Sequence, residues 1–369
     1  MSVINIAQQY ENQAGSLDQA GALIAAFAKS ALIIAGEKAY AAVAARLEPS
    51  LAAAGIATQL QKYPGLPTQA QAGIFAQQAA SLQVQAVIAV GGGRILDLAK
   101  GVAALAGLPL VTIPTIAATC AAFSDLIVYY HPDGSQDCYV FHDEPPRLII
   151  VDPEVLLAAP AQYLHSGVVD SIAKYYEVQS SFNGNRHDLV LRLQIKVSEL
   201  ILETLEQDYT QAFKRSGSNV GTKVSTVVLQ NTLDAIILLA GLVGAIKGNV
   251  AYGGLAHHFY NQTTKIPITQ RRLHGEVVSY GLLVQWVIEG RDDSYVSAHQ
   301  QDFALLGQPV TLAELGITDA VESSVTRIAQ LMKEAVGEYS SAARELTERS
   351  LIEAIYHVDT LGGHVRKGE

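Results

Sequence analysis

The chain contains little cysteine and little charge. Two cysteines, Cys120 and Cys138, occur in 369 residues, so disulfides do not build the fold. With no secretory signal at its start, we expect reduced thiols in a cytoplasmic protein. Charged residues make up 16% of the chain and hydrophobic residues 49%. That balance excludes a disordered protein and is typical of a globular one with a large buried core.

The sequence also lacks any basic run, and its formal net charge is −10. Both features argue against nucleic acid and anionic membranes as partners, because these partners require clustered positive charge. The longest apolar run, residues 235–246, is bounded by Asp234 and Lys247. It is too short to cross a bilayer, so we expect a buried helix there and no membrane partner.

Short apolar runs alternate with helical patterns over the first 152 residues. We expect strands at residues 31–35, 57–63, 86–90, 110–114 and 148–151, and helices at 37–54, 68–82 and from Arg94 onward. This alternation predicts a mainly parallel sheet with helices on both faces. Residues 123–130 and 136–141, joined through Pro132-Asp133-Gly134, predict a hairpin insertion.

The pattern becomes long, Ala/Leu-rich and helical after Asp152-Pro153, with no convincing strand. We expect helices at residues 161–180, 187–208, 220–247, 250–262 and 275–288, with several more near the C-terminus. The sequence therefore predicts an α/β dinucleotide-binding domain over residues 1–155, followed by an all-helical metal and substrate domain over residues 156–369. Small-molecule sites favour the cleft between two such domains.

A glycine-rich turn is the first candidate site. Residues 91–100 read GGGRILDLAK, after an apolar run and before a helical pattern. Backbone N–H groups at such a helix start can approach a diphosphate, provided that Gly91, Gly92 and Gly93 carry no side chains. Glycine also permits the φ values that we expect the turn to need. The motif is neither G-x-G-x-x-G nor a Walker A loop, so a glycine-rich turn without a ligand remains the alternative.

Three residues of the helical half are candidate metal ligands. Asp170 lies among apolar residues of a helical pattern, His257 among small residues, and His274 at a helix start. One carboxylate and two neutral imidazoles with an open fourth position form a catalytic zinc-type site. From the residues alone, the alternatives are pairing of Asp170 with Lys174 and histidines that serve only as hydrogen-bonded structure.

Four separated motifs together resemble the glycerol dehydrogenases and iron-containing alcohol dehydrogenases. They are GGGRILDLAK, IPTIAATCAAFS, VVDSIAKYYE and the pair AHH…LHGE. The resemblance spans nearly the whole chain and implies a dehydroquinate synthase-like fold, with a parallel α/β domain before an all-helical metal-binding domain. Dehydroquinate synthases themselves use a Glu where this chain has Asp170. The relatives are homo-oligomers, so we expect a homo-oligomer that acts on a small-molecule substrate.

The resemblance implies that Asp170, His257 and His274 are the metal ligands and catalytic residues. The two histidines stand seventeen residues apart, as in glycerol dehydrogenases. His258 falls where the family has a small residue, so it ranks below His257. The iron branch has a further histidine four residues after the Asp, where this chain has Lys174. This departure favours zinc over iron.

The resemblance also implies a set of dinucleotide-binding residues. They are Gly36, Gly91, Gly92, Gly93, Arg94, Asp97, Thr115, Thr119, Ser124, Leu126 and Tyr130. Gly36 stands where NAD-preferring members have an acid that accepts the ribose 2′-OH. The missing carboxylate removes one repulsion against a 2′-phosphate, and Lys38 stands nearby in the sequence, so we favour NADP, or use of both nucleotides. Glu37 remains the alternative acid for NAD.

Cys120 bears on the substrate. Glycerol dehydrogenases place an Asp after the Thr of this loop, whereas here Thr119 is followed by Cys120. A thiol is a weak hydrogen-bond partner and is uncharged at its ordinary pKa. The sequence ATCAA instead resembles a branch that reduces 2-oxo acids to 2-hydroxy acids. We therefore favour a metal-dependent, NAD(P)-linked dehydrogenase of small 2-hydroxy acids. The alternatives are a glycerol or other polyol dehydrogenase and, outside catalysis, a nucleotide-binding protein without turnover.

Overall fold

The computed structural model describes residues 3–142, 144–183, 187–216, 225–247, 254–335 and 346–368. Contacts between Cα atoms divide these residues into two units. The first unit comprises Val3–Leu164 and Ile236–Ala245, and the second comprises the described residues of His165–Ala235 and Ile246–Glu369. The domain boundary between residues 155 and 156 was inferred from the start of the helical pattern, and it stays a prediction.

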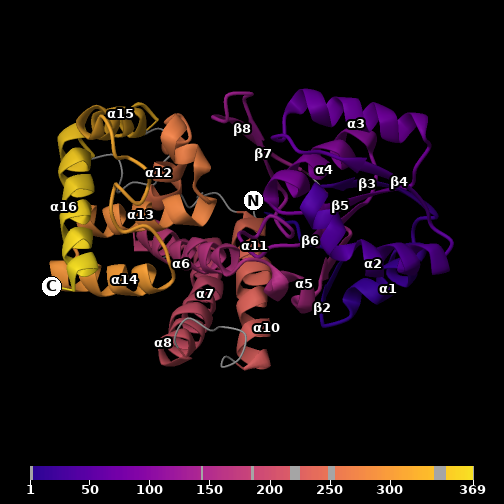
Figure 1. The fold of residues 1–369 in the computed structure, drawn as a ribbon, viewed down its shortest axis with the longest axis horizontal. Coiled ribbons are helices and arrows are strands. Elements are labelled where there is room, and N and C mark those ends of the chain that lie inside the picture. Colours follow the sequence, from indigo (N-terminus) through magenta and orange to yellow (C-terminus); the bar gives the residue numbers. More distant parts are fainter. Residues whose placement is uncertain are drawn as a thin grey trace. The chain divides into compact units, whose positions relative to one another are not determined.

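The first unit is built on a six-stranded parallel sheet with the strand order β2-β9-β6-β5-β3-β4 (Figure 1). A separate antiparallel hairpin pairs β7 with β8. The parallel sheet and the hairpin were both predicted. In chain order the elements are β1 (Val3–Ile4), β2 (Gln9–Asn12), α1 (Ser16–Ala25), β3 (Ser30–Ala35), α2 (Glu37–Ala53), β4 (Ala57–Lys62), α3 (Gln69–Ser81), β5 (Ala86–Gly91), α4 (Gly93–Ala106), β6 (Leu110–Pro114), β7 (Leu126–Tyr130), β8 (Gln136–Phe141), β9 (Leu148–Val151) and α5 (Pro153–Ala158).

Helices cover both faces of this sheet. In Figure 1 the strands lie between α1 and α2 on one side and α3 and α4 on the other. Alternate strand residues such as Ile33 and Ile88 pack with Ile24 and Leu47 of the first helix pair. Their chain neighbours, such as Leu32, point to the opposite face and are equally buried. Burial on both faces explains why the strands are continuous apolar runs rather than alternating patterns.

The first unit differs from the sequence prediction at the start of β7 and in the segment that contains β2 and α1. The predicted strand at residues 123–130 begins only at Leu126, because the backbone N–H groups of Phe123 and Ser124 both donate to the carbonyl of Cys120 and close a turn. Strand β2 and helix α1 were not predicted. Strand β2, with the sequence QYEN, is a polar edge strand, so it lacks the apolar run that marked the others.

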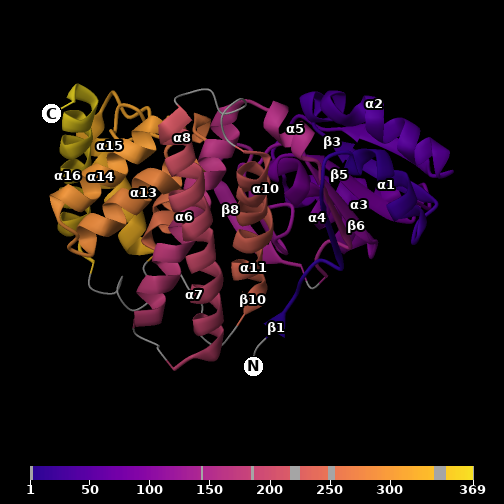
Figure 2. The same cartoon turned by 90° about the horizontal axis from the view of Figure 1, so that it is seen from below.

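Helices make up most of the second unit, as predicted. Helix α16 packs against α13, α14 and α15 (Figure 2). Helix α12 packs against α13. The elements that follow α5 are α6 (Ala161–Asn183), α7 (Leu189–Leu202), η1 (Glu203–Thr210), α8 (Gln211–Ser216), α10 (Thr226–Asp234), η2 (Ala235–Leu239), α11 (Ala240–Ala245), β10 (Ile246–Lys247), α12 (Leu255–Thr263), η3 (Pro267–Arg271), α13 (His274–Ile288), α14 (Asp293–Leu305), α15 (Val321–Glu334) and α16 (Glu348–Lys367).

Several helix bounds differ from those predicted. The expected helix over residues 187–208 is α-helical to Leu202 and then continues as the π-helix η1. Of the helices expected at 220–247 and 250–262, residues 220–224 and 250–253 lie outside the described residues. Ile246–Lys247 forms the two-residue strand β10, although no strand was expected in this half.

The continuous helical stretch Thr226–Ala245 meets the length and composition of a membrane span, with a mean hydropathy of 1.8 over its most apolar window. Half of that window is buried inside the protein. Core helices of soluble proteins meet the same test, so the stretch is weak support for a membrane partner.

Gly21 on α1 tests the packing of the first unit. A Cβ atom at this position would lie 1.9 Å from the carbonyl oxygen of Ser50 on α2. We expect Gly21→Ala to destabilise the protein by about 1–3 kcal/mol, because backbone cannot yield as a side chain can. Gly73→Ala on α3 is the matched control, since a Cβ there meets no atom within 4 Å. It should leave stability unchanged or raise it by up to about 1 kcal/mol. Thermal unfolding of the two variants beside the parent measures both effects.

Candidate metal centre and nucleotide-binding turn

Three side chains from distant parts of the chain meet in the second unit. Asp170 on α6 is buried, and its Oδ1 lies 3.2 Å from Nε2 of His257 on α12 and 3.0 Å from Nε2 of His274 on α13. One ligand atom from each residue lies within 4.8 Å of the others. The structure therefore brings together the three residues that the sequence singled out as candidate ligands.

Gly275 allows His274 to approach Asp170. The Gly275 N–H donates to Oγ of Ser166, which lies one helical turn before Asp170 on α6, at 3.1 Å. A Cβ at Gly275 would lie 2.0 Å from the carbonyl oxygen of Ser166. Glu276 also accepts the Leu273 N–H at 2.8 Å and caps the start of α13. Helix α13 thus begins directly against α6, with His274 as its first residue.

Glu177 joins this group, and sequence reasoning missed it. Its Oε2 lies 2.6 Å from Nδ1 of His257, and its Oε1 accepts the backbone N–H of His257 at 2.8 Å. Only 1% of the Glu177 side chain is exposed. Glu177 follows Asp170 by seven residues, which is two turns along the same face of one helix. That spacing, visible at the end of VVDSIAKYYE, was the signal that could have found it.

The charges of the group keep Asp170 ionised. Burial by itself raises the pKa of the Asp170 carboxyl, but the positive charges of His274 and Lys174 and the hydrogen bonds from both imidazoles hold it well below its ordinary value. Burial by itself lowers the pKa of His257, but the Glu177 charge and the hydrogen bonds to Asp170 and Glu177 raise it to about 9. Without an ion, the His257 ring at neutral pH is a cation held between two carboxylates.

This donor set fits a divalent cation. A carboxylate oxygen and two imidazole nitrogens converge on one point, and three protein ligands with an open position are the usual arrangement of a catalytic zinc site. The carboxylate on the far ring nitrogen of His257 is the partner that metal-binding histidines generally have. Asp170, His257 and His274 are therefore the residues that would hold the ion.

His258 does not join the group. Only 3% of the residue is exposed, and its Nε2 lies 3.1 Å from the carbonyl oxygen of Met332 on α15. Burial lowers the pKa of His258 to about 3, so its imidazole is neutral at physiological pH. The contact with α15 accounts for this histidine as part of the core.

The glycine turn lies in the first unit, between β5 and α4. No side chain caps α4 at Gly92, so the first N–H groups of the helix are available to an anion. The expected need for unusual φ values was wrong, because none of Gly91, Gly92 and Gly93 has a positive φ. Two of these glycines are instead required because neighbouring side chains leave no room for a Cβ atom. A Cβ at Gly91 would lie 2.8 Å from Cβ of Ile95, and one at Gly92 would lie 2.6 Å from Cδ1 of Ile116.

Two neighbouring loops are hydrogen-bonded to the strand that ends in this turn. The Gly36 N–H, after β3, donates to the Val90 carbonyl at 3.3 Å, and the Thr115 N–H, after β6, donates to the Gly91 carbonyl at 3.2 Å. The two strands that follow β3 in the sequence, β4 and β5, pair with β3 on its opposite sides. Open α/β sheets bind ligands at the carboxyl ends of strands beside such a switch point.

The remaining nucleotide candidates lie in α4, in β7 and in the loop between β6 and β7. Asp97 is bonded to the Lys100 ammonium at 2.9 Å and to the Val128 N–H at 3.3 Å, and Lys100 also donates to the Leu126 carbonyl at 2.7 Å. This network ties α4 to β7. Arg94 is exposed and Cys120 is half-buried. Thr119 accepts the Ala121 N–H, Ser124 accepts the Leu126 N–H, and the Tyr130 N–H donates to Pro67. Nucleotide contacts by Arg94, Asp97, Thr119, Ser124, Leu126 and Tyr130 stay predictions, as does a place near the substrate for Cys120.

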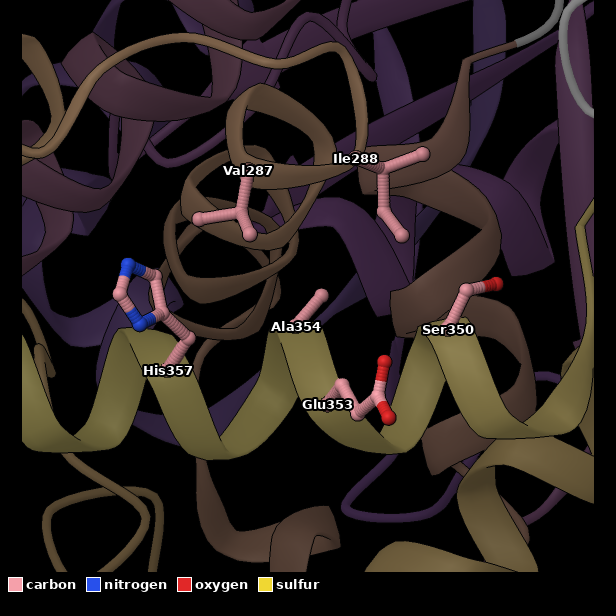
Figure 3. Close-up of a pocket in the computed structure, with 6 residues that line it drawn as sticks. All are labelled: Val287, Ile288, Ser350, Glu353, Ala354 and His357. Atoms are coloured by element: carbon pink, nitrogen blue, oxygen red, sulfur yellow. The ribbon is translucent and has the colours of Figure 1, made fainter.

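A hollow of about 370 Å³ lies elsewhere in the second unit (Figure 3). It is lined by Val287, Ile288, Ser350, Glu353, Ala354 and His357. Val287 lies thirteen residues beyond His274 on α13, about 20 Å along the helix axis. Polar side chains that line the hollow already bond to protein partners, since Glu353 pairs with Arg349 and His357 pairs with Asp293. We assign it no part in the candidate site.

Known proteins agree with this architecture. A family model described as iron-containing alcohol dehydrogenase matches residues 7–153. Hydroxycarboxylate dehydrogenase A of Escherichia coli is 37% identical over 66% of each chain. Glycolaldehyde reductase of Halobacterium salinarum is 31% identical over 91% of each chain.

The chain belongs to the iron-containing alcohol dehydrogenase family. It is accordingly an NAD(P)-linked oxidoreductase that acts on CH–OH groups. The crystal structure of glycerol dehydrogenase from Schizosaccharomyces pombe has a TM-score of 0.85 at 25% identity, over 99% of this chain and 92% of that one. This likeness confirms the predicted fold class of a parallel α/β domain followed by a helical one.

We call Asp170, His257 and His274 the triad. Loss of one triad residue should weaken metal binding strongly without unfolding this alcohol dehydrogenase. We expect His274→Ala and Asp170→Asn to lower zinc affinity at least about 100-fold, because loss of an outer-shell partner alone typically costs 10–100-fold. Metal analysis after dialysis, with circular dichroism for the fold, measures this. His258→Gln is the control. It should keep the metal and lose about 1–3 kcal/mol of stability with its buried hydrogen bond. Full zinc binding by both triad variants would contradict the assignment.

Proposed function

We propose that this enzyme interconverts small 2-hydroxy acids and 2-oxo acids, using a nicotinamide dinucleotide and one divalent ion. The observation that carries the dehydrogenase chemistry is the convergence of Asp170, His257 and His274. Zinc is favoured over iron, because Lys174 stands where a fourth ligand would lie. A divalent ion bound by the three side chains supplies Lewis-acid chemistry that favours hydride transfer at a carbonyl carbon.

The protein's own groups have separate tasks in this proposal. Asp170 stays ionised, so it can neutralise positive charge in the site. The open N-terminus of α4 behind Gly91 and Gly92 receives the diphosphate of the dinucleotide, whose nicotinamide carries the hydride. Arg271 and Arg272 precede His274 in the chain, with Leu273 between them and that ligand, and among the described residues neither guanidinium forms an ion pair. They are the cations that we propose for a substrate carboxylate.

Cys120 and the relatives support the choice of substrate. A neutral thiol in place of an Asp leaves no charge to repel a substrate carboxylate. The relative at 37% identity is a hydroxycarboxylate dehydrogenase, although the match covers 66% of each chain. A second candidate is reduction of a small hydroxyaldehyde or oxidation of a polyol, since a glycolaldehyde reductase matches 91% of the chain. We further expect a soluble cytoplasmic homo-oligomer.

A substrate panel separates these candidates. We expect the zinc-loaded enzyme to show higher kcat/KM for 2-oxo acids than for glycolaldehyde, and to show little oxidation of glycerol. Spectrophotometric assays with both reduced nucleotides, and with zinc or iron, measure the rates. A strong preference for glycerol would establish the polyol alternative, and no turnover with any substrate would favour a binding protein.

Cys120→Asp sharpens the same test. We expect the variant to lose about tenfold or more in kcat/KM for 2-oxo acids, because two negative charges several ångströms apart repel by at least about 1.4 kcal/mol in a partly buried site. Cys120→Asn, which is polar but neutral, should change the value much less. Equal losses in the two variants would show that shape rather than charge matters at this position.

Two charged residues near Gly36, Glu37 and Lys62, bear on the preference between NAD and NADP. Glu37 forms an ion pair with Lys62 at 2.6 Å, and both side chains are largely exposed. Lys62 ends β4 in register with Ala35, the last residue of β3. We propose that NADP is accepted, alone or together with NAD, and that Lys62 contributes to binding of its 2′-phosphate. Glu37, the first residue of α2, is the acid that we propose for a ribose hydroxyl when NAD is used instead.

Lys62→Gln tests this assignment. We expect KM for NADPH to rise about two- to fivefold, the size of an exposed ion pair, with KM for NADH unchanged. Lys29→Gln is the matched control, because Lys29 precedes β3 at the opposite end of the strand. A variant that binds NADPH as tightly as the parent would remove Lys62 from the proposal.

A further inference from the structure

We propose that Glu177 is a positioning residue that sets the tautomer and ring orientation of His257 for metal binding. This inference rests on the proposed metal site and names a residue outside the triad. Both carboxylate oxygens of Glu177 are committed to one residue, since Oε2 lies 2.6 Å from Nδ1 of His257 and Oε1 accepts its backbone N–H at 2.8 Å. The carboxylate thus holds the ring and the backbone of His257 together.

The chemistry of the two partners fixes the proton on the ring. An ionised carboxylate only accepts hydrogen bonds, so Nδ1 of His257 must carry a hydrogen. Nε2 faces Oδ1 of Asp170 at the longer distance of 3.2 Å and donates to it while the ring is a cation; an ion that takes the place of this hydrogen binds the Nε2 lone pair. The opposite tautomer would direct an N–H towards the ion. Glu177 therefore selects the form of His257 that can act as a ligand at the triad.

The hydrogen bond from the His257 N–H holds Glu177 in place independently of its contact with the imidazole ring. His257 is the third residue of α12, and its N–H is among those at a helix start that lack a partner within the helix. Glu177 caps this N–H from another helix, where the positive end of α12 favours a negative charge. Gln285 caps the preceding N–H, that of Ala256, at 3.3 Å. The carboxylate is thus anchored to backbone.

The space for Glu177 is shaped by Gly254. A Cβ at Gly254 would lie 1.8 Å from Cγ and 2.1 Å from Oε1 of Glu177. Any side chain at residue 254 would therefore displace the carboxylate from its contacts with His257. Gly254 has an extended backbone with a φ of −112°, so the absence of a side chain, and not the backbone angle, is what this position requires.

Glu177→Gln separates positioning from packing. Glutamine keeps an oxygen for the His257 N–H but turns an NH₂ group towards Nδ1, which then has to accept and leaves the hydrogen on Nε2. We expect zinc affinity to fall about 10–100-fold, as for other outer partners of metal-bound histidines, with Tm and circular dichroism close to the parent. Competition with a zinc chelator measures the affinity. ¹⁵N NMR of His257 in the zinc-loaded parent and variant reports which ring nitrogen binds the ion and which carries the hydrogen.

Glu206→Gln is the matched control. Glu206 lies in the same unit, and its carboxylate pairs with a different histidine, His299, at 3.2 Å. Its replacement should change zinc affinity less than twofold. Gly254→Ala is a second route to the same effect if Glu177→Gln folds poorly, because it displaces Glu177 without removing the carboxylate. Gly363→Ala, where a Cβ meets nothing within 4 Å, is its control.

The outcomes distinguish this inference from the proposed function. A parent protein that binds no divalent ion would overturn the metal site and this inference with it. A parent that binds zinc, beside a folded Glu177→Gln variant that binds within twofold as tightly, would overturn the role of Glu177 alone. A zinc-loaded parent in which Nδ1 of His257, and not Nε2, binds the ion would do the same.

Discussion

His257 and His274 both donate to Oδ1 of Asp170, a carboxylate that is almost fully buried. This arrangement constrains how the helices of the second unit pack. An ionised carboxylate is costly to bury unless charges and donors surround it. Here His257, His274 and Lys174 compensate the charge, but only if α6, α12 and α13 come together. Gly275 permits the approach of α13 to α6. Gly281 does the same between α13 and α12, since a Cβ there would lie 2.7 Å from the Ala256 carbonyl oxygen. The contacts that pack these helices are thus the contacts that assemble the ligands.

The first unit reaches its candidate site by another route. Its candidate site follows from strand order and from backbone groups at the ends of β3, β5 and β6, with few side chains involved. The ends of these strands are fastened to one another by the N–H groups of Gly36 and Thr115. Asp97 and Lys100 face inward and hold β7 against α4. One unit thus offers oriented backbone dipoles, and the other offers charged and imidazole side chains.

The sequence foretold the parts of the fold whose signal is local. Ile33 and Ile88 lie in apolar runs that are buried on both sides, and such runs mark central strands wherever they occur. Strand β2 could not be found in this way, because Gln9 and Glu11 lie at an edge of the sheet, where pairing with β9 residues 139 positions later decides the structure. The turn at Phe123 likewise depends on hydrogen bonds to Cys120 that no periodicity records. At the metal centre, Asp170, His257 and His274 were found through motifs. Glu177 was overlooked, although it ends one of those motifs, because its role depends on where α12 begins.

The first unit is not one continuous stretch of chain. Residues Ile236–Ala245, which follow the whole of α6 through α10, return to it, and Gly241 packs so closely on Phe123 that a Cβ would lie 2.6 Å from its ring. A fragment cut at residue 155 would therefore lose a helix and uncover the loop that carries Thr119 and Cys120. During synthesis on the ribosome, the first unit cannot be completed until the 81 residues from His165 to Ala245 have emerged. Excising it as an independent module would require grafting that late helix onto its end.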